Sequence, residues 1–268
     1  MNDLNLERLA GELGRIAERA GDAILDIYRQ DFTVEHKEDE SPLTQADLAS
    51  HRIISAELGR LTPGIPVLSE ESADIDFETR SGWNDYWLVE PLDGTKEFVN
   101  RNGEFTVNIA LIRDHEPVLG VVYVPVTAIT YTGIVGSGAT RTDPGGRPSP
   151  VSVRLPCADP LVVVGSRSHA NPALADHLAA FGNYELVSMG SSLKFCLVAE
   201  GKADFYPRLG PTSEWDTAAA HAVVLAAGGR IVTLQGEPLR YNLKASLLNP
   251  EFLVISDPDR DWLTAFRD

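Results

Sequence analysis

Acidic side chains occur at distant places in this 268-residue chain, each at the end of a predicted helix or strand. Glu70 follows a short apolar run that is typical of a strand, and Glu90 ends a second such run. Asp93 lies where a turn is predicted to open a helix, and Asp216 lies at the start of an Ala-rich helical segment. Helices and strands hold the side chains at their ends in fixed directions. If these acids act together, the fold must bring carboxylates from distant parts of the sequence to one place.

The rest of the chain alternates between helical and strand patterns. Apolar residues at steps of three and four from Leu6 to Ile27 predict an amphipathic helix. A second helix is predicted from Thr44 to beyond Leu58, with Thr44 and Asp47 at the spacing of a capping box. Further strands are predicted at 65–68, 86–89, 105–112, 118–124, 128–134, 161–164, 203–206, 231–234 and 252–255, and further helices at 173–180, 191–199 and 215–227.

Only residues 136–150, dense in Gly, Pro, Ser and Thr, indicate an internal boundary. We therefore expect two halves, residues 1–150 with most of the acidic motifs and residues 151–268 with Asp216. The order of elements predicts an α/β protein, a layered α+β sandwich.

The composition limits the partners and the compartment. A formal net charge of −16 disfavours nucleic acid and anionic membranes, because phosphate groups are normally bound by exposed Lys and Arg. The two cysteines, Cys157 and Cys196, have no CxxC spacing, which favours small buried side chains in a reducing compartment. We find no signal-peptide pattern and no apolar run near the roughly 20 residues of a membrane span, so we expect a cytoplasmic protein.

The acidic motifs together predict a metal centre. Hard cations such as Mg²⁺ prefer oxygen ligands from carboxylates, carbonyls, waters and substrate phosphate. Glu70, Glu90, Asp93 and Asp216, with the carbonyl of Leu92, would supply ligands for two ions.

Such a pair of ions suits phosphate chemistry. Two ions can hold both the attacking and the leaving oxygen of an in-line displacement. The amides of Gly94 and Thr95, at a predicted helix start, are suited to cradle phosphate oxygens. An acidic protein that handles phosphate needs such cations to reverse its local field.

Each acid also has an ordinary structural interpretation. Asp216 alone is typical of a helix N-cap, and Asp93 before a glycine is a common turn residue. Glu70 with its acidic neighbour is typical of a solvated surface, and Asp47 is explained by the capping box. The metal interpretation therefore depends on their joint occurrence, in order and at element ends.

Longer stretches of the sequence resemble a known family. Residues 87–95 (WLVEPLDGT), continuing K-E-F, resemble the D-P-x-D-G-T signature of the inositol monophosphatase-like phosphatases. Residues 102–111, 166–169, 190–201 and 206–208 resemble its CysQ branch, the 3'(2'),5'-bisphosphate nucleotidases. The resemblance covers nearly the whole chain. It implies the alternating helix and sheet layers of the inositol monophosphatase and fructose-1,6-bisphosphatase fold, and a part in sulfur metabolism.

The resemblance also implies metal ligands. One Mg²⁺ would be held by Glu70, Glu90 and the carbonyl of Leu92, and a second by Glu90, Asp93 and Asp216. Thr95 would contact the attacking water and pair with Asp47, so that the pair orients this water and accepts its proton.

The implied substrate, adenosine 3',5'-bisphosphate, carries a second phosphate away from the reaction. Lys194 and Arg208 would bind it as a point charge and a fork, with hydrogen bonds from Ser191 and His169. Lys194 is also explained as a snorkelling helix residue and Arg208 as a surface ion-pair partner. For His221 a packed or surface position is favoured over ligation.

Glu90 departs from the family pattern, which has Asp at this position. The extra methylene moves the carboxylate by about one bond length, and sites of this kind tolerate little misplacement. Either the site has compensated, or the enzyme is slow, or the residue was altered to trap a bound state. We expect weakened metal binding or turnover.

Three functions compete. The leading one is hydrolysis of the 3'-phosphate of adenosine 3',5'-bisphosphate to AMP, in a monomer or homodimer with no nucleic-acid partner. An inositol or sugar monophosphate phosphatase would use the same metals without a second phosphate site. A nucleotide binder that no longer turns over is motivated by Glu90. A purely structural or interaction protein is disfavoured, because that role does not require ordered acids at element ends.

Overall fold

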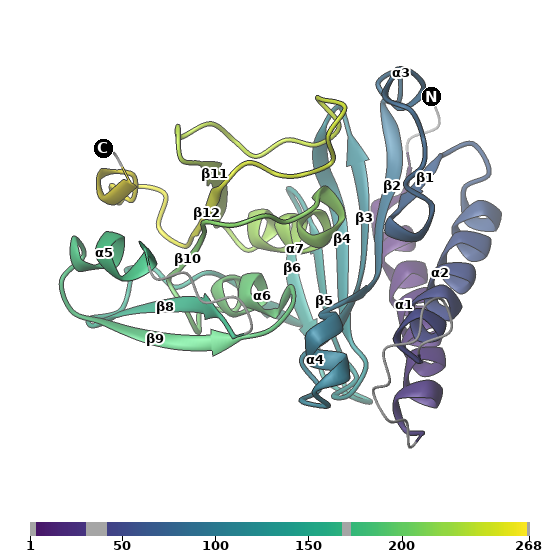
Figure 1. The fold of residues 1–268 in the computed structure, drawn as a ribbon, viewed down its shortest axis with the longest axis horizontal. Coiled ribbons are helices and arrows are strands. Elements are labelled where there is room, and N and C mark those ends of the chain that lie inside the picture. The colour runs from purple at the N-terminus through teal and green to yellow at the C-terminus, as the bar shows by residue number, and fades with distance from the viewer. Residues whose placement is uncertain (1–3, 31–41, 168–172, 267–268) are drawn as a thin grey trace.

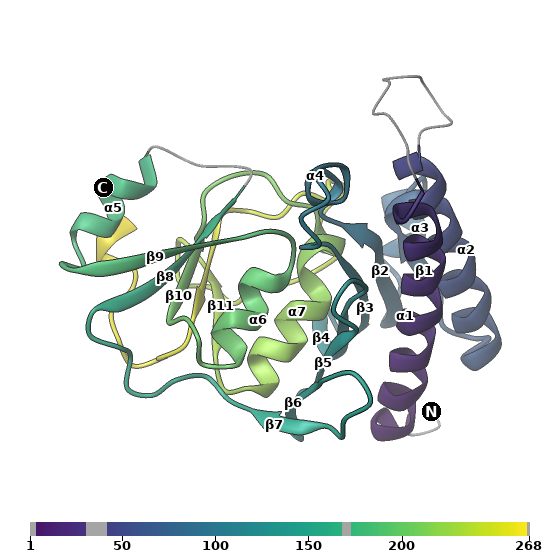
Figure 2. The ribbon, with the colours of Figure 1, turned by 90° about the horizontal axis from the view of Figure 1, so that it is seen from below.

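Helices and sheets alternate in layers across the molecule (Figure 1). The helix pair α1 (Leu6–Tyr28) and α2 (Pro42–Leu61) covers one face of a seven-stranded sheet. Helix α7 (Glu214–Ala226) packs on the other face, beside α6 (Leu193–Ala199), and a five-stranded sheet lies beyond these two helices (Figure 2). This arrangement confirms the predicted layered α+β sandwich.

The computed structural model describes residues 4–30, 42–167 and 173–266. The seven-stranded sheet contains, in order, β1 (Val67–Ser69), β2 (Asp85–Asp93), β3 (Thr106–Arg113), β4 (Glu116–Val124), β5 (Ile129–Ile134), β6 (Gly138–Thr142) and β7 (Ser149–Val151). The five-stranded sheet contains, in order across it, β11 (Arg230–Thr233), β12 (Phe252–Ile255), β10 (Phe205–Arg208), β8 (Leu161–Ser166) and β9 (Tyr184–Met189). The shorter helical elements are η1 (Glu70–Ser72), α3 (Phe77–Arg80), α4 (Thr95–Val99), α5 (Ala173–Ala179) and η2 (Thr264–Phe266).

The outer helices follow the predicted pattern, with one correction. The apolar stripe of α1 is buried against the sheet and α2, as its spacing predicts. Helix α2, however, begins at Pro42, where proline is well tolerated because the first helical N–H needs no partner within the helix. Thr44 therefore lies inside the first turn, and the predicted capping box of Thr44 and Asp47 is wrong.

The seven-stranded sheet is an antiparallel meander from β2 to β7, with β1 parallel to β2. Its side chains alternate between two cores. Leu88 and Ala110 belong to the core that contains α7, whereas Val89 and Ile109 belong to the core that contains α1 and α2. The predicted meander over residues 105–134 is confirmed.

Strand β2 was predicted over residues 86–89 with Glu90 at its end and Pro91 stopping it, but it continues through Pro91 to Asp93. The pairing with β3 shifts register between Glu90 and Asp93, which is the pattern of a β-bulge. A proline is tolerated at such a bulge because the ladder loses its regular hydrogen bonds there. The bulge therefore places Pro91 inside the strand and changes the direction of the acids on either side.

Close packing fixes α7 against this sheet. A Cβ atom at Gly120 on β4 would lie 2.1 Å from the carbonyl oxygen of Ala219, and one at Gly133 on β5 would lie 2.5 Å from Cα of Val223. Only glycine at these two positions lets the helix approach so closely. The start of α7, which carries Asp216, is thereby held over the sheet that carries Glu90.

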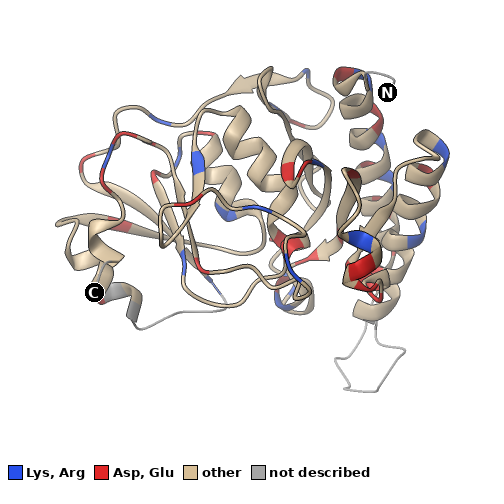
Figure 3. Cartoon of the chain, turned by 90° about the horizontal axis from the view of Figure 1, so that it is seen from above, with Lys and Arg blue, Asp and Glu red and all other residues tan. Residues whose placement is uncertain are grey.

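Residues 136–150 contain β6 and the start of β7, so the seven-stranded sheet extends through the region expected to be a boundary. The division into residues 1–150 and 151–268 stays a prediction. Strand β9 was not predicted, because three of its six side chains are exposed and it lies at a sheet edge, so its sequence lacks an apolar run. Across the described residues, no helix has the length and apolarity that a bilayer span requires. Acidic and basic side chains are spread over the outer helices and the loops (Figure 3).

Candidate functional site

Three of the predicted metal ligands meet at one point. Carboxylate oxygens of Glu70, Glu90 and Asp216 all lie within 4.8 Å of one another. They come from the 3₁₀ turn after β1, from β2 and from the first turn of α7. Glu70 and Glu90 are about 20 residues apart in the sequence, and Glu90 and Asp216 are about 126 residues apart, so distant segments supply one cluster.

The helix start explains how Asp216 is oriented. Ser213 is the N-cap of α7, and Asp216 is the N3 residue that completes a capping box with it. Oδ2 of Asp216 accepts a hydrogen bond of 2.8 Å from the Ser213 amide. Asp216 thus closes the capping box without being the N-cap itself. The cap interaction and the position in the acidic cluster occur together, so they are not alternatives.

Glu90 divides its two oxygens between the backbone and the cluster. Its Oε1 accepts a hydrogen bond of 3.1 Å from the Leu92 amide, across the bulge. Its Oε2 is buried and has no hydrogen-bond partner among the described residues. Burial, followed by the neighbouring carboxylate of Glu70, raises the pKa of Glu90 well above its usual value.

Asp93 lies beside the cluster and is bound to the second half of the chain. Its Oδ2 accepts hydrogen bonds of 2.6 Å from the Ser192 amide and 2.7 Å from the Ser192 hydroxyl. The same hydroxyl donates a hydrogen bond of 2.9 Å to the backbone carbonyl of Asp216. Burial raises the pKa of Asp93, while the charge of Lys194 opposes this rise.

The cluster suits a divalent cation. Burial and the charge of Asp93 raise the pKa of Asp216 to about 7, which reflects the cost of holding several carboxylates together. The unpartnered Oε2 of Glu90 is the kind of buried acceptor that a hard cation satisfies. Glu70, Glu90 and Asp216 could hold such an ion, with Asp93 and the Leu92 carbonyl nearby on β2.

Asp47 reaches this region from α2. Burial, then the charges of Glu71 and Glu70, raise the pKa of Asp47 to about 8. Thr95 is exposed at the start of α4 and lines the cavity described below. The pairing of Thr95 with Asp47 stays a prediction.

Gly94 allows the sharp turn into α4. It is the N-cap of this helix with φ of 98°, in the left-handed region that favours glycine. A Cβ atom there would lie 3.2 Å from the carbonyl oxygen of Glu104 and from Cα of Phe105. The chain can therefore turn directly from Asp93 to Thr95 beside the cluster.

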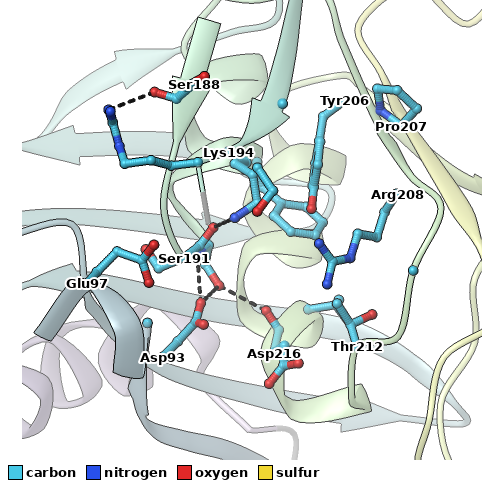
Figure 4. A pocket seen from close by; sticks show the side chains of 18 of the residues that line it. Asp93, Glu97, Ser188, Ser191, Lys194, Tyr206, Pro207, Arg208, Thr212 and Asp216 are labelled. Atoms are coloured by element: carbon cyan, nitrogen blue, oxygen red, sulfur yellow. Dashed lines mark hydrogen bonds between the residues drawn. The ribbon is translucent and has the colours of Figure 1, made fainter. Parts of the chain in front are cut away.

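A cavity of about 790 Å³ contains both the cluster and the predicted cationic residues. Glu70, Glu90, Asp93 and Asp216 line it, and so do Leu92, Gly94, Thr95, Ser191, Lys194 and Arg208. Lys194 and Arg208 lie above Asp93 and Asp216 in Figure 4. The cavity thus has an acidic end and a cationic end.

The cationic end is preorganised. Lys194 is buried, and its Nζ donates a hydrogen bond of 2.5 Å to the Ser191 carbonyl and lies 5.6 Å from the centre of the Tyr206 ring. Burial lowers the pKa of Lys194 to about 8, against the charge of Asp93. Arg208 donates a hydrogen bond of 2.7 Å to the Pro211 carbonyl, and its buried Nε has no partner among the described residues. The predicted ligand His169 lies outside the described residues.

Several residues that hold the acids in place were not predicted from the sequence. Ser192, next to the predicted Ser191, bridges Asp93 and the Asp216 carbonyl, and Asn108 on β3 donates a hydrogen bond of 2.9 Å to its hydroxyl. Ser50 on α2 donates a hydrogen bond of 2.8 Å to the Pro91 carbonyl in the bulge. No local pattern marks such contacts, because each joins segments that are far apart in sequence.

His221 is buried on α7, with its Nδ1 2.9 Å from the Tyr241 hydroxyl. Burial lowers the pKa of His221 to about 3, so it is neutral at ordinary pH. The predicted packed position is confirmed.

Comparison with known proteins places the chain among phosphatases. The model of the inositol monophosphatase family matches residues 5–258. The chain is 50% identical over 242 residues to the 3'(2'),5'-bisphosphate nucleotidase CysQ of Escherichia coli K12, covering 90% of this chain and 96% of that protein. It is 37% identical to the CysQ protein of Haemophilus influenzae, with 97% of both chains covered.

Solved structures agree with this fold. The crystal structure of CysQ from Bacteroides thetaiotaomicron, a member of the inositol monophosphatase family, matches with a TM-score of 0.85 at 42% identity, covering 95% of this chain and 99% of that chain. The inositol monophosphatase of Anabaena sp. PCC 7120 matches with a TM-score of 0.76 at 25% identity, covering 98% and 96%.

Proposed function

The chain belongs to the inositol monophosphatase family, and on that basis we propose that it is a Mg²⁺-dependent 3'(2'),5'-bisphosphate nucleotidase. It would hydrolyse the 3'-phosphate of adenosine 3',5'-bisphosphate to give AMP and phosphate. The observation that carries this proposal is one cavity with an acidic end and a cationic end. The acidic end suits metal-assisted hydrolysis, and the cationic end suits a second phosphate.

The acidic end would hold the reacting phosphate. Glu70, Glu90 and Asp216 would bind Mg²⁺, with Asp93 and the Leu92 carbonyl completing a site for two or more ions. Bound Mg²⁺ lowers the pKa of water and neutralises phosphate charge. Because the three carboxylates repel one another, their arrangement favours cation binding over an empty cluster.

The chain's own residues would handle the attacking water. Thr95 would orient it, and Asp47 would accept its proton as the water oxygen bonds to phosphorus and the bond from phosphorus to the ribose 3'-oxygen breaks. The 3'-oxygen leaves as the alkoxide and takes its proton from solvent. Asp47 can act as a base only when ionised, and a cation beside Glu70 would lower its pKa from about 8 by opposing the carboxylate charges that raise it.

The cationic end would select the substrate. Lys194 and Arg208 would bind the 5'-phosphate, with hydrogen bonds from Ser191 and His169, while the Gly94 amide supports the reacting phosphate. Lys194 and Arg208 are already anchored by backbone carbonyls, so little side-chain freedom is lost on binding.

One observation favours a second candidate, a nucleotide binder with impaired turnover. The long side chain of Glu90 folds back to the Leu92 amide, so one of its oxygens is occupied by the backbone where the family has the shorter Asp. In that case the nucleotide would bind in the cavity without release of phosphate.

Phosphate release distinguishes these functions. The purified protein is incubated with adenosine 3',5'-bisphosphate, inositol 1-phosphate and fructose 1,6-bisphosphate, with Mg²⁺ or with a chelator. We expect Mg²⁺-dependent release chiefly from the nucleotide. Preference for the inositol or hexose compound would contradict the nucleotide assignment, and calorimetric binding of the nucleotide without release would support the impaired binder.

The proposal also covers the substrate class, the cellular location and the oligomeric state. A small-molecule substrate and a cytoplasmic location fit the two free cysteines and the acidic composition. Monomer or homodimer stays a prediction.

A further inference from the structure

Residues from three of the CysQ-like stretches, 102–111, 166–169 and 190–201, contact one another. The proposed reaction assigns no role to this contact. Arg167 donates two hydrogen bonds, of 2.8 and 2.7 Å, to the two carboxylate oxygens of Glu104. Oε2 of Glu104 also accepts a hydrogen bond of 2.8 Å from the Gly190 amide. Arg167 donates another hydrogen bond, of 2.9 Å, to the Ser188 carbonyl. One ion pair thus joins the loop before β3 to the ends of β8 and β9.

The turn of residues 190–192 is held by two acids from the first half of the chain. Glu104 accepts from the Gly190 amide at 2.8 Å, and Asp93 accepts from the Ser192 amide at 2.6 Å. Ser191 lies between them with φ of 45°, a conformation that non-glycine residues adopt only when their surroundings impose it. The two acids supply that constraint.

This turn also carries the cationic end of the cavity. The Ser191 carbonyl accepts the hydrogen bond from Nζ of Lys194, so the direction of that carbonyl sets where the charge lies. Ser191 and Lys194 both line the cavity. A shift of the turn would move both groups together.

Packing leaves no space for a side chain at Gly190. A Cβ atom at Gly190 would lie 2.5 Å from Cγ of Glu97 and 3.1 Å from Cβ of Glu104. The backbone at Gly190 is therefore pressed against two acidic side chains of the first half, and Arg167 balances the charge of one of them.

From these contacts we infer that the Glu104–Arg167 pair positions the 190–192 turn and thereby sets the preference for substrates that carry a second phosphate. Glu104 acts through the Gly190 amide, and Arg167 acts by holding the Glu104 carboxylate in place with its bidentate fork. Both are positioning residues. The inference rests on the proposed nucleotidase function, which it deepens.

The test compares two nucleotides that differ only in the second phosphate. For wild type, Glu104→Ala and Arg167→Ala, kcat/KM is measured with adenosine 3',5'-bisphosphate and with adenosine 3'-monophosphate. We expect the ratio of the two values to fall about tenfold or more in both variants, as the loss of an oriented charged contact predicts. The fall should come mainly from KM for the bisphosphate.

Control variants separate positioning from general damage. The exposed ion pair of Arg240 and Glu116 has a similar distance of 2.8 Å and lies elsewhere, so Glu116→Ala should leave the ratio unchanged. Glu104→Gln keeps an acceptor for the Gly190 amide and should retain part of the preference, and it replaces Glu104→Ala if that variant does not fold. Gly190→Ala, which displaces the same turn, should lower the ratio as Glu104→Ala does.

The outcomes are distinct. An equal fall with both nucleotides would contradict the inference and leave only a structural role. A lower ratio in Arg167→Ala with an unchanged ratio in Glu104→Ala would overturn it in favour of Arg167 as a phosphate ligand. Failure of the wild-type protein to prefer the bisphosphate would count against the proposed function itself, whereas wild-type preference that both variants retain would count against the Glu104–Arg167 inference alone.

Discussion

The two ends of the cavity are built in opposite ways. The acidic end collects Glu70, Glu90 and Asp216 from a 3₁₀ turn, a strand and a helix that are distant in sequence. Burial, with the charges of neighbouring carboxylates, raises the pKa of Glu90 and Asp216. The cationic end contains Lys194 and Arg208, each bonded to a backbone carbonyl within three residues. Under the proposed function an external cation would complete the acidic end, whereas the cationic end is already held by hydrogen bonds within the chain.

Removing one acid should separate stability from activity. Asp216→Asn keeps an acceptor for the Ser213 amide but removes one repelling charge, so we expect kcat/KM to fall about 100-fold or more. Because the charge is removed, thermal unfolding in the presence of a chelator should occur at a higher temperature than in wild type. Unchanged Mg²⁺-dependent turnover would contradict the metal assignment, and the exposed Glu237→Gln serves as the control.

Shortening Glu90 tests whether its length limits the acidic end. Glu90→Asp cannot reach the Leu92 amide in the same way and should return both oxygens to the cluster. We expect half-saturation at a lower Mg²⁺ concentration and turnover about tenfold faster. If the rate and the metal dependence stay as in wild type, the extra methylene has been compensated elsewhere.

The cationic end should respond to pH in a predictable direction. Burial lowers the pKa of Lys194 to about 8, so its charge is present below that pH and is lost as the pH rises through it. KM for the bisphosphate should therefore increase above about pH 8. Lys194→Arg, which stays charged, should remove this increase, and Lys194→Met should raise KM about tenfold at neutral pH. A pH-independent KM in wild type would contradict the assignment.

The buried His221 should make the free energy of unfolding depend on pH. Its folded pKa of about 3 lies below the unfolded value near 6.5, so the unfolded chain binds a proton first as the pH falls. His221 thus costs about 1.4 kcal/mol of stability for each pH unit between these values. In His221→Gln the free energy of unfolding should fall less steeply over that range, as measured by denaturant titration. The same slope as in wild type would show that His221 does not govern acid unfolding.

Local patterns predicted much of the fold. Helix α1 was predicted from its apolar stripe, and the meander and strand β12 were predicted from short apolar runs, because each of these elements buries its own side chains. The start of α2 was predicted two residues late, because the spacing of Thr44 and Asp47 was interpreted as a capping box. The bulge after Glu90 was not predicted, because Pro91 was interpreted as the end of the strand.

The acids of the site were named from the sequence, but the residues that orient them were not. Ser192, Asn108 and Ser50 act through contacts across the fold, and nothing in their neighbourhood distinguishes them from ordinary polar residues. Contacts between segments that are distant in sequence cannot be predicted from local patterns, whereas a carboxylate at the end of a helix or strand can be recognised in the sequence.

The direct test of the account is the position of a bound ion. A crystal of the wild-type protein soaked in Mn²⁺ should give an anomalous difference peak within coordination distance of carboxylate oxygens from Glu70, Glu90 and Asp216. A peak elsewhere, or a site at these three side chains that stays empty at saturating Mn²⁺, would contradict the claim that they form a metal centre.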